Sequence, residues 1–177
     1  AFGNAASRNH SFGWEAEAAV DNAREQVAKL IGADPKEIVF TSGATEADNL
    51  ALKGVFEMYA GKGNHIITCN IEHKAVLDTC KHIEKQGGEI TCLKVKENGL
   101  IDLAELEAAI KPNTILISIM YANNEIGTIM PMEEIAALAK KKGILVFSDA
   151  TQAVGKIPID INKIGIDLMA FTAHKMY

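Results

Sequence analysis

Short apolar strands that alternate with amphipathic helices constrain the fold of this 177-residue chain more than any other feature of its sequence. Between residues 15 and 31, apolar side chains recur with a period of 3.6 residues, and Gly32 follows as a residue type that commonly ends helices. The segment 114–120 is instead largely apolar throughout, which is typical of a strand buried on both faces of a sheet. This alternation predicts an α/β fold of three layers, in which helices cover both faces of a mostly parallel sheet.

Each expected element shows either helical periodicity or a short run rich in β-formers. The expected helices are 15–31, 44–59, 75–85, 103–110 and 132–142. The expected strands are 37–41, 65–69, 89–95, 114–120, 144–148 and 167–171. Residues 1–14 form a separate N-terminal segment, and residues 15–177 are expected to form one domain or a large part of one. Because the chain has no initiator Met and halts directly after a strand, it is expected to belong to a longer protein.

Charge, apolar runs and cysteine spacing limit the kinds of partner that this chain is expected to bind. The chain has 18 Lys and Arg against 23 Asp and Glu, a net charge of −5, and the charges are interspersed. A nucleic-acid partner is not expected, because no basic stripe is visible. The apolar runs, such as 143–147, stop well short of the roughly 20 residues of a membrane-spanning helix, so no membrane is expected either. Cys69, Cys80 and Cys92 lack any zinc-type spacing, which predicts reduced cytoplasmic thiols and no metal site.

Five polar groups follow predicted strands, where ligands bind in sheets of this kind. They are 41–46, His73, 123–125, Asp149 and Lys175. In the first of them, Gly43 permits a tight turn, and the free N–H groups at the head of the following helix, with the Thr45 hydroxyl, would hold a phosphate dianion. The alternative is an ordinary N-cap, in which Ser42 or Thr45 serves the helix alone.

Asp149 and Lys175 each follow an apolar strand. A carboxylate such as Asp149 is costly at the end of a buried strand unless it meets a cation or several donors, and a protonated ring nitrogen would be such a partner. The alternative is a helix N-cap or a loop carboxylate. A partly desolvated Lys175 would lose its proton readily and form a Schiff base, whereas an ordinary lysine would face solvent.

His73 and the segment 123–125 complete the set. The imidazole would stack on a flat ligand and move protons, or be a satisfied loop histidine. The amides of Asn123 and Asn124 would bind a ligand hydroxyl or carboxylate, or form an Asx turn. Together the five groups supply what pyridoxal 5′-phosphate requires: a phosphate cradle, an amine for its aldehyde, a carboxylate for its ring nitrogen, a stacking group and a donor to its ring oxygen.

The order of these motifs resembles that of the NifS/IscS-type cysteine desulfurases, which are class V aminotransferases among the fold type I pyridoxal phosphate enzymes. The resemblance covers essentially the whole chain and rests on residues 12–14, 38–46, 72–77, 123–127, 149–152 and 174–177. It implies that residues 15–177 are the large, cofactor-binding domain, truncated after its lysine, and that the small C-terminal domain is absent. A nucleotide-binding Rossmann sheet is disfavoured, because 42–45 has one glycine where the dinucleotide turn needs three.

The resemblance also implies roles for single residues. Lys175 would be the internal aldimine lysine, Asp149 would pair with the pyridinium nitrogen, and His73 would stack on the ring and act as acid and base. Gln152 would donate to the ring oxygen, and Asn124 would lie beside the ring and the substrate. The phosphate would be held by Ala44, Thr45, Thr172 and His174.

The activity implied is removal of sulfur from L-cysteine, which leaves alanine and an enzyme-bound persulfide for iron–sulfur cluster or thio-cofactor assembly. A homodimer, a sulfur-acceptor or scaffold protein and a bacterial cytoplasm are implied too, with an organelle matrix as the alternative location. The persulfide cysteine and the substrate-binding arginine would lie downstream of Lys175, so the 177 residues alone are expected to be inactive. The alternatives are a selenocysteine lyase or other class V aminotransferase, and a catalytically inactive structural fragment.

Overall fold

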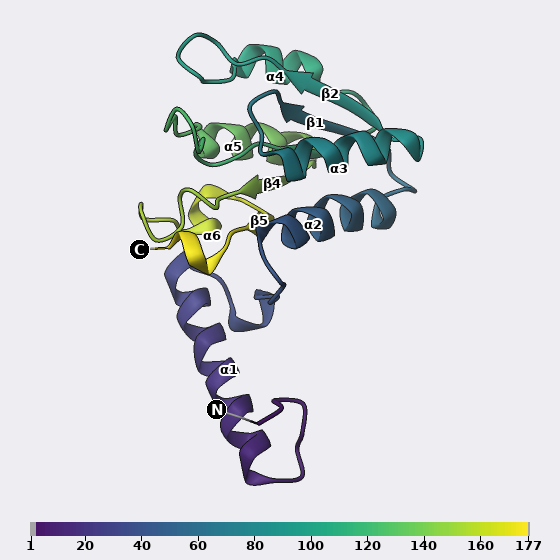
Figure 1. The fold of residues 1–177 in the computed structure, drawn as a ribbon. Helices are drawn as coiled ribbons and strands as arrows, with labels where there is room; N and C mark the ends of the chain where they lie inside the picture. The colour runs from purple at the N-terminus through teal and green to yellow at the C-terminus, as the bar shows by residue number, and fades with distance from the viewer. Residues whose placement is uncertain (1–2, 177) are drawn as a thin grey trace.

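A single sheet of five parallel strands forms the centre of the molecule (Figure 1). The computed structural model describes residues 3–176. The strands are β1 (His65–Cys69), β2 (Glu89–Leu93), β3 (Thr114–Ser118), β4 (Leu145–Asp149) and β5 (Leu168–Ala170), in the spatial order β2-β1-β3-β4-β5. This confirms the predicted α/β class with a parallel sheet.

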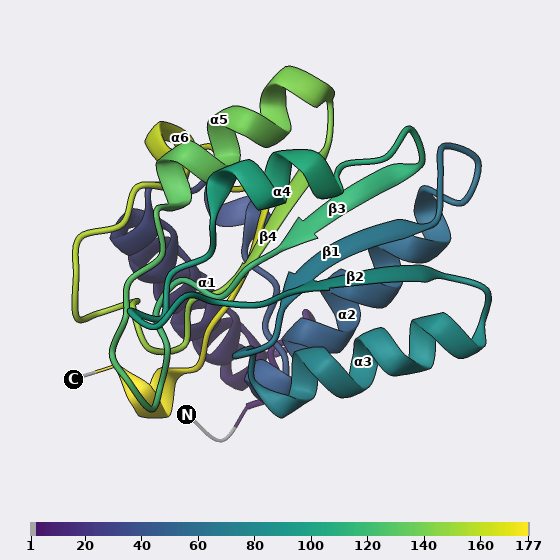
Figure 2. The same cartoon turned by 90° about the horizontal axis from the view of Figure 1, so that it is seen from above.

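Helices cover both faces of the sheet, as the sequence predicted (Figure 2). The helices are α1 (Ser11–Ile31), α2 (Ala44–Met58), α3 (Lys74–Lys85), α4 (Leu103–Ala109), α5 (Met132–Lys142) and α6 (Ile161–Ile164), with short 3-10 turns η1 (Pro35–Glu37) and η2 (Ala173–Lys175). On the α2 and α3 face, Leu52 and Ile83 pack against Phe147 and Leu116. The second core lies on the opposite face and contains Leu106 of α4 together with the buried apolar residues of α5 and α6.

Strand β3 shows why these segments form a central strand. All five of its residues are buried, and the side chains alternate between the two faces of the sheet, so that Leu116 joins one core and Ile117 the other. A strand that carries buried apolar side chains on both faces is stable only when other elements of the fold cover both faces. The carboxyl ends of β1, β3, β4 and β5 therefore open at one edge of a fixed framework.

The expected strand at 37–41 does not form, which is a correction to the sequence-based prediction. Asp34 and Glu37 form a capping box around η1, so the first residue of the expected strand lies in a 3-10 turn. The remaining residues are extended but pair with no strand in the part of the chain that the structure describes. They lie beside α1, where Arg24 donates to the Ile38 carbonyl and stacks over the ring of Phe40, 4.9 Å from its centroid. β-Propensity predicts a strand only where a partner is available.

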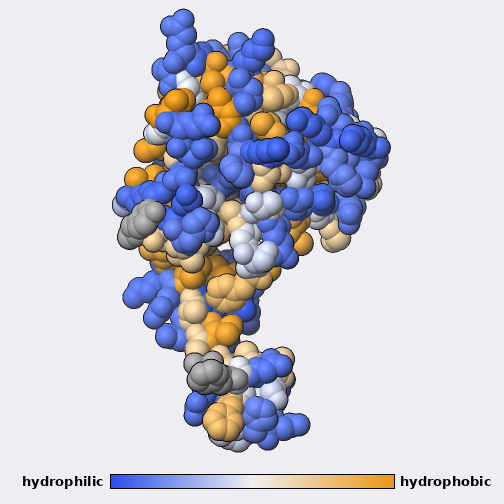
Figure 3. Space-filling model, viewed as in Figure 1, coloured by the Kyte–Doolittle hydropathy of each residue, from blue (hydrophilic) through white to orange (hydrophobic). Residues whose placement is uncertain are grey.

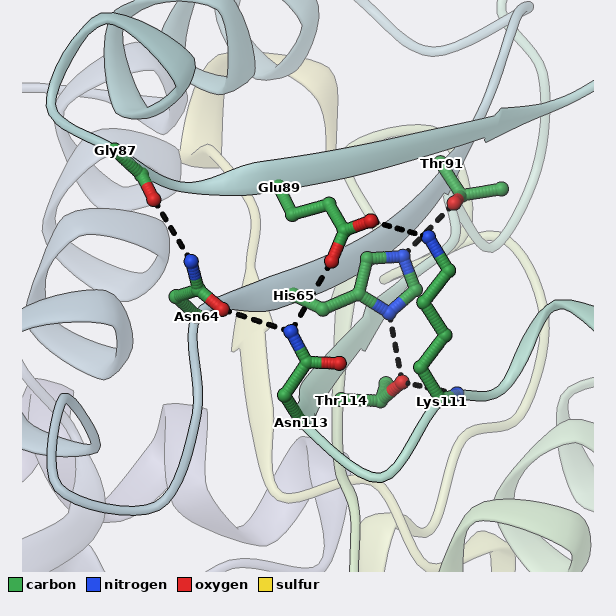
Figure 4. A network of polar contacts seen from close by, with 8 residues as sticks. All are labelled: Asn64, His65, Gly87, Glu89, Thr91, Lys111, Asn113 and Thr114. Carbon is green, nitrogen blue, oxygen red and sulfur yellow. Dashed lines mark hydrogen bonds and ion pairs between the residues drawn. The ribbon is translucent and has the colours of Figure 1, made fainter.

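A polar network closes the amino-terminal end of the sheet, opposite the strand ends named above (Figure 4). His65 is fully buried at the start of β1; its Nδ1 lies 2.7 Å from the Thr114 hydroxyl and its Nε2 lies 2.8 Å from the Thr91 hydroxyl. Beside it, Lys111 pairs with Glu89. The other members of the network are Asn64, Gly87 and Asn113. These bonds hold the starts of β1, β2 and β3 together.

Among residues 3–176, no helix is both long and apolar enough to span a bilayer. The same residues contain no group of three or more His, Cys, Asp or Glu side chains that could hold a metal ion.

Candidate functional site

The carboxyl ends of the strands converge on a cavity of about 420 Å³. This volume lies within the usual range for small-molecule sites, roughly 300 to 1,000 Å³. The cavity is lined by every residue that the sequence nominated as a cofactor ligand, namely Ala44, Thr45, His73, Asn124, Asp149, Gln152, Thr172, His174 and Lys175. Four of these segments follow β1, β3, β4 and β5, and parallel strands end at the same edge of a sheet. The fifth is the start of α2, which follows no strand among the described residues.

Helix α2 begins at the cavity with an open N-terminus. Its N-cap is Gly43, which has no side chain to bond the first N–H groups, and a Cβ built there would meet nothing within 4 Å. Ser42 donates its N–H to the Glu46 carboxylate at 2.6 Å. Hydrogen bonding by the Ser42 side chain, and then by its N–H, lowers the pKa of Glu46, and no side chain caps the helix. The alternative of an ordinary side-chain cap is therefore not what the structure shows. The N–H groups of Ala44 and Thr45 are available to an anion, as a phosphate cradle requires.

Asp149 is the last residue of β4 and is buried. Its Oδ1 accepts the N–H of Thr151 at 3.0 Å, which is the local loop contact that the sequence left open as an alternative. The carboxylate lines the cavity as well, so the loop contact orients it without removing it from the site.

His73 is the N-cap of α3. Its Nδ1 accepts the N–H of Ala75 at 3.2 Å, so the proton of the neutral ring lies on Nε2. The imidazole therefore caps α3 and also lines the cavity, so the two interpretations of His73 from the sequence are compatible. The nitrogen free to exchange a proton with a ligand is Nε2.

His174 and Lys175 lie on η2, shortly after β5, and Thr172 is the N-cap of this turn. The Thr172 hydroxyl lies 3.0 Å from Nδ1 of His174, and the N–H of Lys175 donates to the Thr172 carbonyl at 3.2 Å. This one turn presents a hydroxyl, an imidazole and an amine to the same cavity. No residue of η2 is fully buried, so Lys175 is reachable by a ligand.

Gln152 and Asn124 complete the lining on the loop side. The Gln152 side-chain oxygen accepts from the Lys156 ammonium at 2.6 Å, which leaves its amide nitrogen as a donor to a ligand oxygen. Asn124 follows Asn123, whose side-chain oxygen accepts the N–H groups of Glu125 and Ile126. The Asx turn considered from the sequence is thus present and is made by Asn123, while Asn124 lines the cavity.

Two buried acids near the cavity were not among the residues predicted from the sequence. Asp48 on α2 is 0% exposed, with no partner for either carboxyl oxygen among the described residues, and burial raises its pKa to about 8, helped by the charge of Asp149. Glu72, directly before His73, is 6% exposed, and burial raises its pKa to about 8. Asp48 falls in line with the buried Leu52 on the apolar face of α2, and that position is the signal that could have identified it.

The cysteines have environments that suit no nucleophile. Cys69 and Cys80 are buried, and burial raises the pKa of each thiol far above its ordinary value. Cys92 is exposed on β2, yet the pKa of its thiol is raised as well, chiefly by partial burial. A thiolate is the reactive form, so the raised pKa values disfavour all three thiols as nucleophiles at neutral pH.

The comparison with known proteins agrees with this geometry. The family description "Aminotransferase class-V" matches residues 1–177, so the chain belongs to the class V aminotransferase family. Two curated relatives are named cysteine desulfurase IscS: the chain is 61% identical to that of Pectobacterium carotovorum over 176 residues (99% of this chain, 44% of the relative) and 61% identical to that of Proteus mirabilis, with the same shares. The chain spans less than half the length of these relatives.

Solved structures of similar proteins share the fold of this chain. A structure described as a NifS-like protein superposes with a TM-score of 0.94 at 45% identity and covers 98% of this chain and 48% of that one. A structure described as SspA in complex with cysteine superposes with a TM-score of 0.92 at 43% identity, covering 96% and 49%.

Proposed function

We propose that these 177 residues are the cofactor-binding part of a pyridoxal phosphate-dependent cysteine desulfurase. The observation that carries the proposal is the gathering of an uncapped helix N-terminus, a buried carboxylate, an imidazole and a lysine around one cavity of about 420 Å³. The names of the relatives and the cysteine in the description of the SspA structure support L-cysteine as the substrate.

The residues present fit the cofactor. The open N–H groups at the head of α2, with Thr172 and His174, would hold the phosphate, and the amine of Lys175 would hold the aldehyde carbon. Asp149 would bring its negative charge to the ring nitrogen. When bound, pyridoxal phosphate supplies an electron sink for bonds at the substrate α-carbon.

The other residues of the chain bind and move protons. His73 would stack on the ring and carry its proton on Nε2, the nitrogen not used to cap α3. The amide nitrogen of Gln152 would donate to the ring oxygen, since its oxygen is taken by Lys156. Asn124, on the loop side of the cavity, would contact the substrate.

The sulfur-accepting part of the reaction would use residues outside this chain. We place the persulfide cysteine there, because Cys69, Cys80 and Cys92 are unsuited to attack. The resemblance to the desulfurases implies the same for the arginine that binds the substrate carboxylate. The products would be alanine and a protein persulfide, passed to a sulfur acceptor or scaffold for iron–sulfur cluster or thio-cofactor assembly. The proposed setting is the cytoplasm, where thiols stay reduced.

A homodimer is part of the proposal. Helix α1 projects from the body of the molecule (Figure 1) and carries exposed apolar side chains, among them Phe12 at 66% and Trp14 at 57%. Apolar surface is visible along this helix in the space-filling view (Figure 3). Contiguous exposed apolar surface is a mark of protein–protein contact.

The test uses the full-length protein that contains these residues. Purified with pyridoxal phosphate, it is expected to absorb in the visible range, and borohydride is expected to fix the cofactor to the Lys175 peptide in a mass spectrum. Lys175→Ala should lose both the fixed adduct and alanine release from L-cysteine while keeping its fold by circular dichroism. Alanine release from L-selenocysteine but not L-cysteine would favour a selenocysteine lyase instead, and a protein that binds no pyridoxal phosphate would leave only a structural role.

A further inference from the structure

Two buried side chains with no role in the proposed chemistry join the loops on either side of the cavity. Glu72 lies in the loop between β1 and α3, directly before His73. Asn123 lies in the loop after β3, directly before Asn124. They are 6% and 7% exposed, so both side chains are turned inward.

Glu72 replaces a missing strand at the end of the sheet. Beyond β3, the N–H groups of Ile119 and Tyr121 donate to carbonyls of β4 at 3.1 and 2.9 Å. Alternate residues of a strand point their N–H groups to opposite neighbours, so the N–H of Met120 points towards β1. Strand β1 has already ended at Cys69, and Oε1 of Glu72 accepts the Met120 N–H at 2.6 Å in place of a strand carbonyl.

Asn123 makes the return contact. Its Nδ2 donates to the carbonyl of Ile71 at 3.0 Å, in the same loop as Glu72. Its Oδ1 meanwhile accepts the N–H groups of Glu125 and Ile126, at 2.9 and 3.0 Å. One side chain therefore shapes its own loop and holds the opposite loop at the same time.

We infer that Glu72 and Asn123 form a reciprocal clamp that fixes His73 relative to Asn124 across the cavity. Each loop supplies a side chain to the backbone of the other, and each of these side chains is adjacent in sequence to a cavity-lining residue. They are positioning residues, since they act on a ligand only through His73 and Asn124. The inference rests on the proposed function for the roles of those two neighbours.

The protonation of Glu72 agrees with an acceptor role. Oε1 accepts two bonds, from the Met120 N–H and from the Cys69 thiol at 3.3 Å, whereas Oε2 is buried without a partner among the described residues. Burial raises the pKa of Glu72 to about 8, which favours the neutral acid at pH 7, and the two bonds that Oε1 accepts need only an acceptor oxygen in either protonation state. A glutamine at this position would keep the same acceptor.

Matched substitutions separate the clamp from folding. Glu72→Ala removes the acceptor for Met120, while Glu72→Gln keeps it. Asn123→Asp keeps the oxygen that closes the 123–126 turn and removes the amide nitrogen that donates to the Ile71 carbonyl and, at 3.4 Å, to the Met120 sulfur. Ile83→Val, a buried change on α3 outside the clamp, controls for loss of stability alone.

The experiment measures the dissociation constant of pyridoxal phosphate and the visible circular dichroism of the bound cofactor in the full-length protein. Glu72→Ala and Asn123→Asp should each weaken binding about tenfold and change the dichroism, an effect of the size seen when residues that orient a ligand group are lost. Glu72→Gln and Ile83→Val should stay within about twofold of wild type, well below that tenfold loss. In a His73→Ala, Asn124→Ala background, Glu72→Ala should have no further effect.

Two binding results would overturn the clamp. One is that Glu72→Gln weakens pyridoxal phosphate binding as much as Glu72→Ala does. The other is that Glu72→Ala weakens binding by the same factor in the His73→Ala, Asn124→Ala background as in wild type. Hydrogen exchange in the apoprotein gives a readout that needs no cofactor: the Met120 amide should exchange faster in Glu72→Ala than in Glu72→Gln. Equal exchange rates would refute the clamp even if wild type binds pyridoxal phosphate. Wild type that binds none would refute the proposed function, while the exchange rates still decide the clamp. If Glu72→Ala does not fold, Asn123→Asp carries the same comparison.

Discussion

Single buried residues set the charge of the site. Asp48 has no hydrogen-bond partner among the described residues, and its raised pKa, about 8, keeps it neutral at pH 7. Glu72 is neutral for the same reason, which is burial. Asp149 lines the cavity and is oriented by the Thr151 N–H. The buried acids Asp48 and Glu72 therefore add little negative charge beside Asp149, whereas the Glu46 carboxyl, whose pKa is lowered by its hydrogen bonds with Ser42, also lines the cavity.

At the other end of the sheet, His65 predicts a pH dependence of stability. Burial lowers the pKa of this imidazole below its ordinary value of 6.5, with a smaller contribution from the positive charge of Lys111 and an opposing one from Glu89. The unfolded chain therefore binds a proton below about pH 6.5 that the folded chain does not, and the free energy of unfolding falls as pH drops through that value. Urea unfolding from pH 8 to pH 5 should show this loss.

His65→Gln should flatten the decline, because glutamine does not titrate. His82→Gln, which changes an exposed histidine on α3, should keep the wild-type slope. A His65→Gln protein with the same slope as wild type would show that this imidazole titrates freely in the folded state.

At the scale of elements, the end of α1 is fixed by a glycine. Gly32 has a φ of +76°, and a Cβ there would lie 2.8 Å from Oδ1 of Asp160, the N-cap of α6. The amide of Asn162 on α6 also donates to the Gly32 carbonyl. The left-handed turn thus lets α1 end directly against the start of α6.

Gly32→Ala should destabilise the protein by more than the left-handed strain alone, which is about 1 to 2 kcal/mol. Gly143→Ala is the matched control, because Gly143 ends α5 at a φ of +68° with nothing within 4 Å of a built Cβ. Thermal or urea unfolding should therefore rank Gly32→Ala as the more damaging of the two. Equal losses would mean that Asp160 moves aside at no cost.

Elements also show what a sequence can and cannot predict. The parallel sheet followed from the apolar runs, and with it the gathering of Asp149 and Lys175 at one edge; the segment 41–46 reaches the same cavity without a preceding strand. The strand expected at 37–41 was wrong, because periodicity does not reveal whether a neighbouring strand exists. The Glu72 and Asn123 bonds join side chains of one loop to the backbone of another, and such contacts depend on how the loops meet in three dimensions.

In the whole molecule, the two ends of the sheet differ in how their polar groups are used. The amino ends of β1, β2 and β3 are joined by the His65 network (Figure 4). Near the carboxyl ends lie the cavity-lining residues and Asp48, whose carboxyl oxygens have no hydrogen-bond partner among the described residues. The polar groups at the amino ends are thus bonded to one another, whereas those around the cavity include groups available to a ligand.

The projecting helix α1 leads to a prediction for the whole molecule in solution. Phe12 and Trp14 are 66% and 57% exposed, and adjacent exposed apolar side chains of this size favour contact with another protein surface. If the proposed homodimer uses this surface, Phe12→Ser combined with Trp14→Ser in the full-length protein should shift the mass measured by light scattering from dimer towards monomer. Met58→Ser, which removes a single side chain 82% exposed at the end of α2, should leave the dimer intact. A double variant that remains fully dimeric at micromolar concentration would show that the start of α1 does not hold the dimer together.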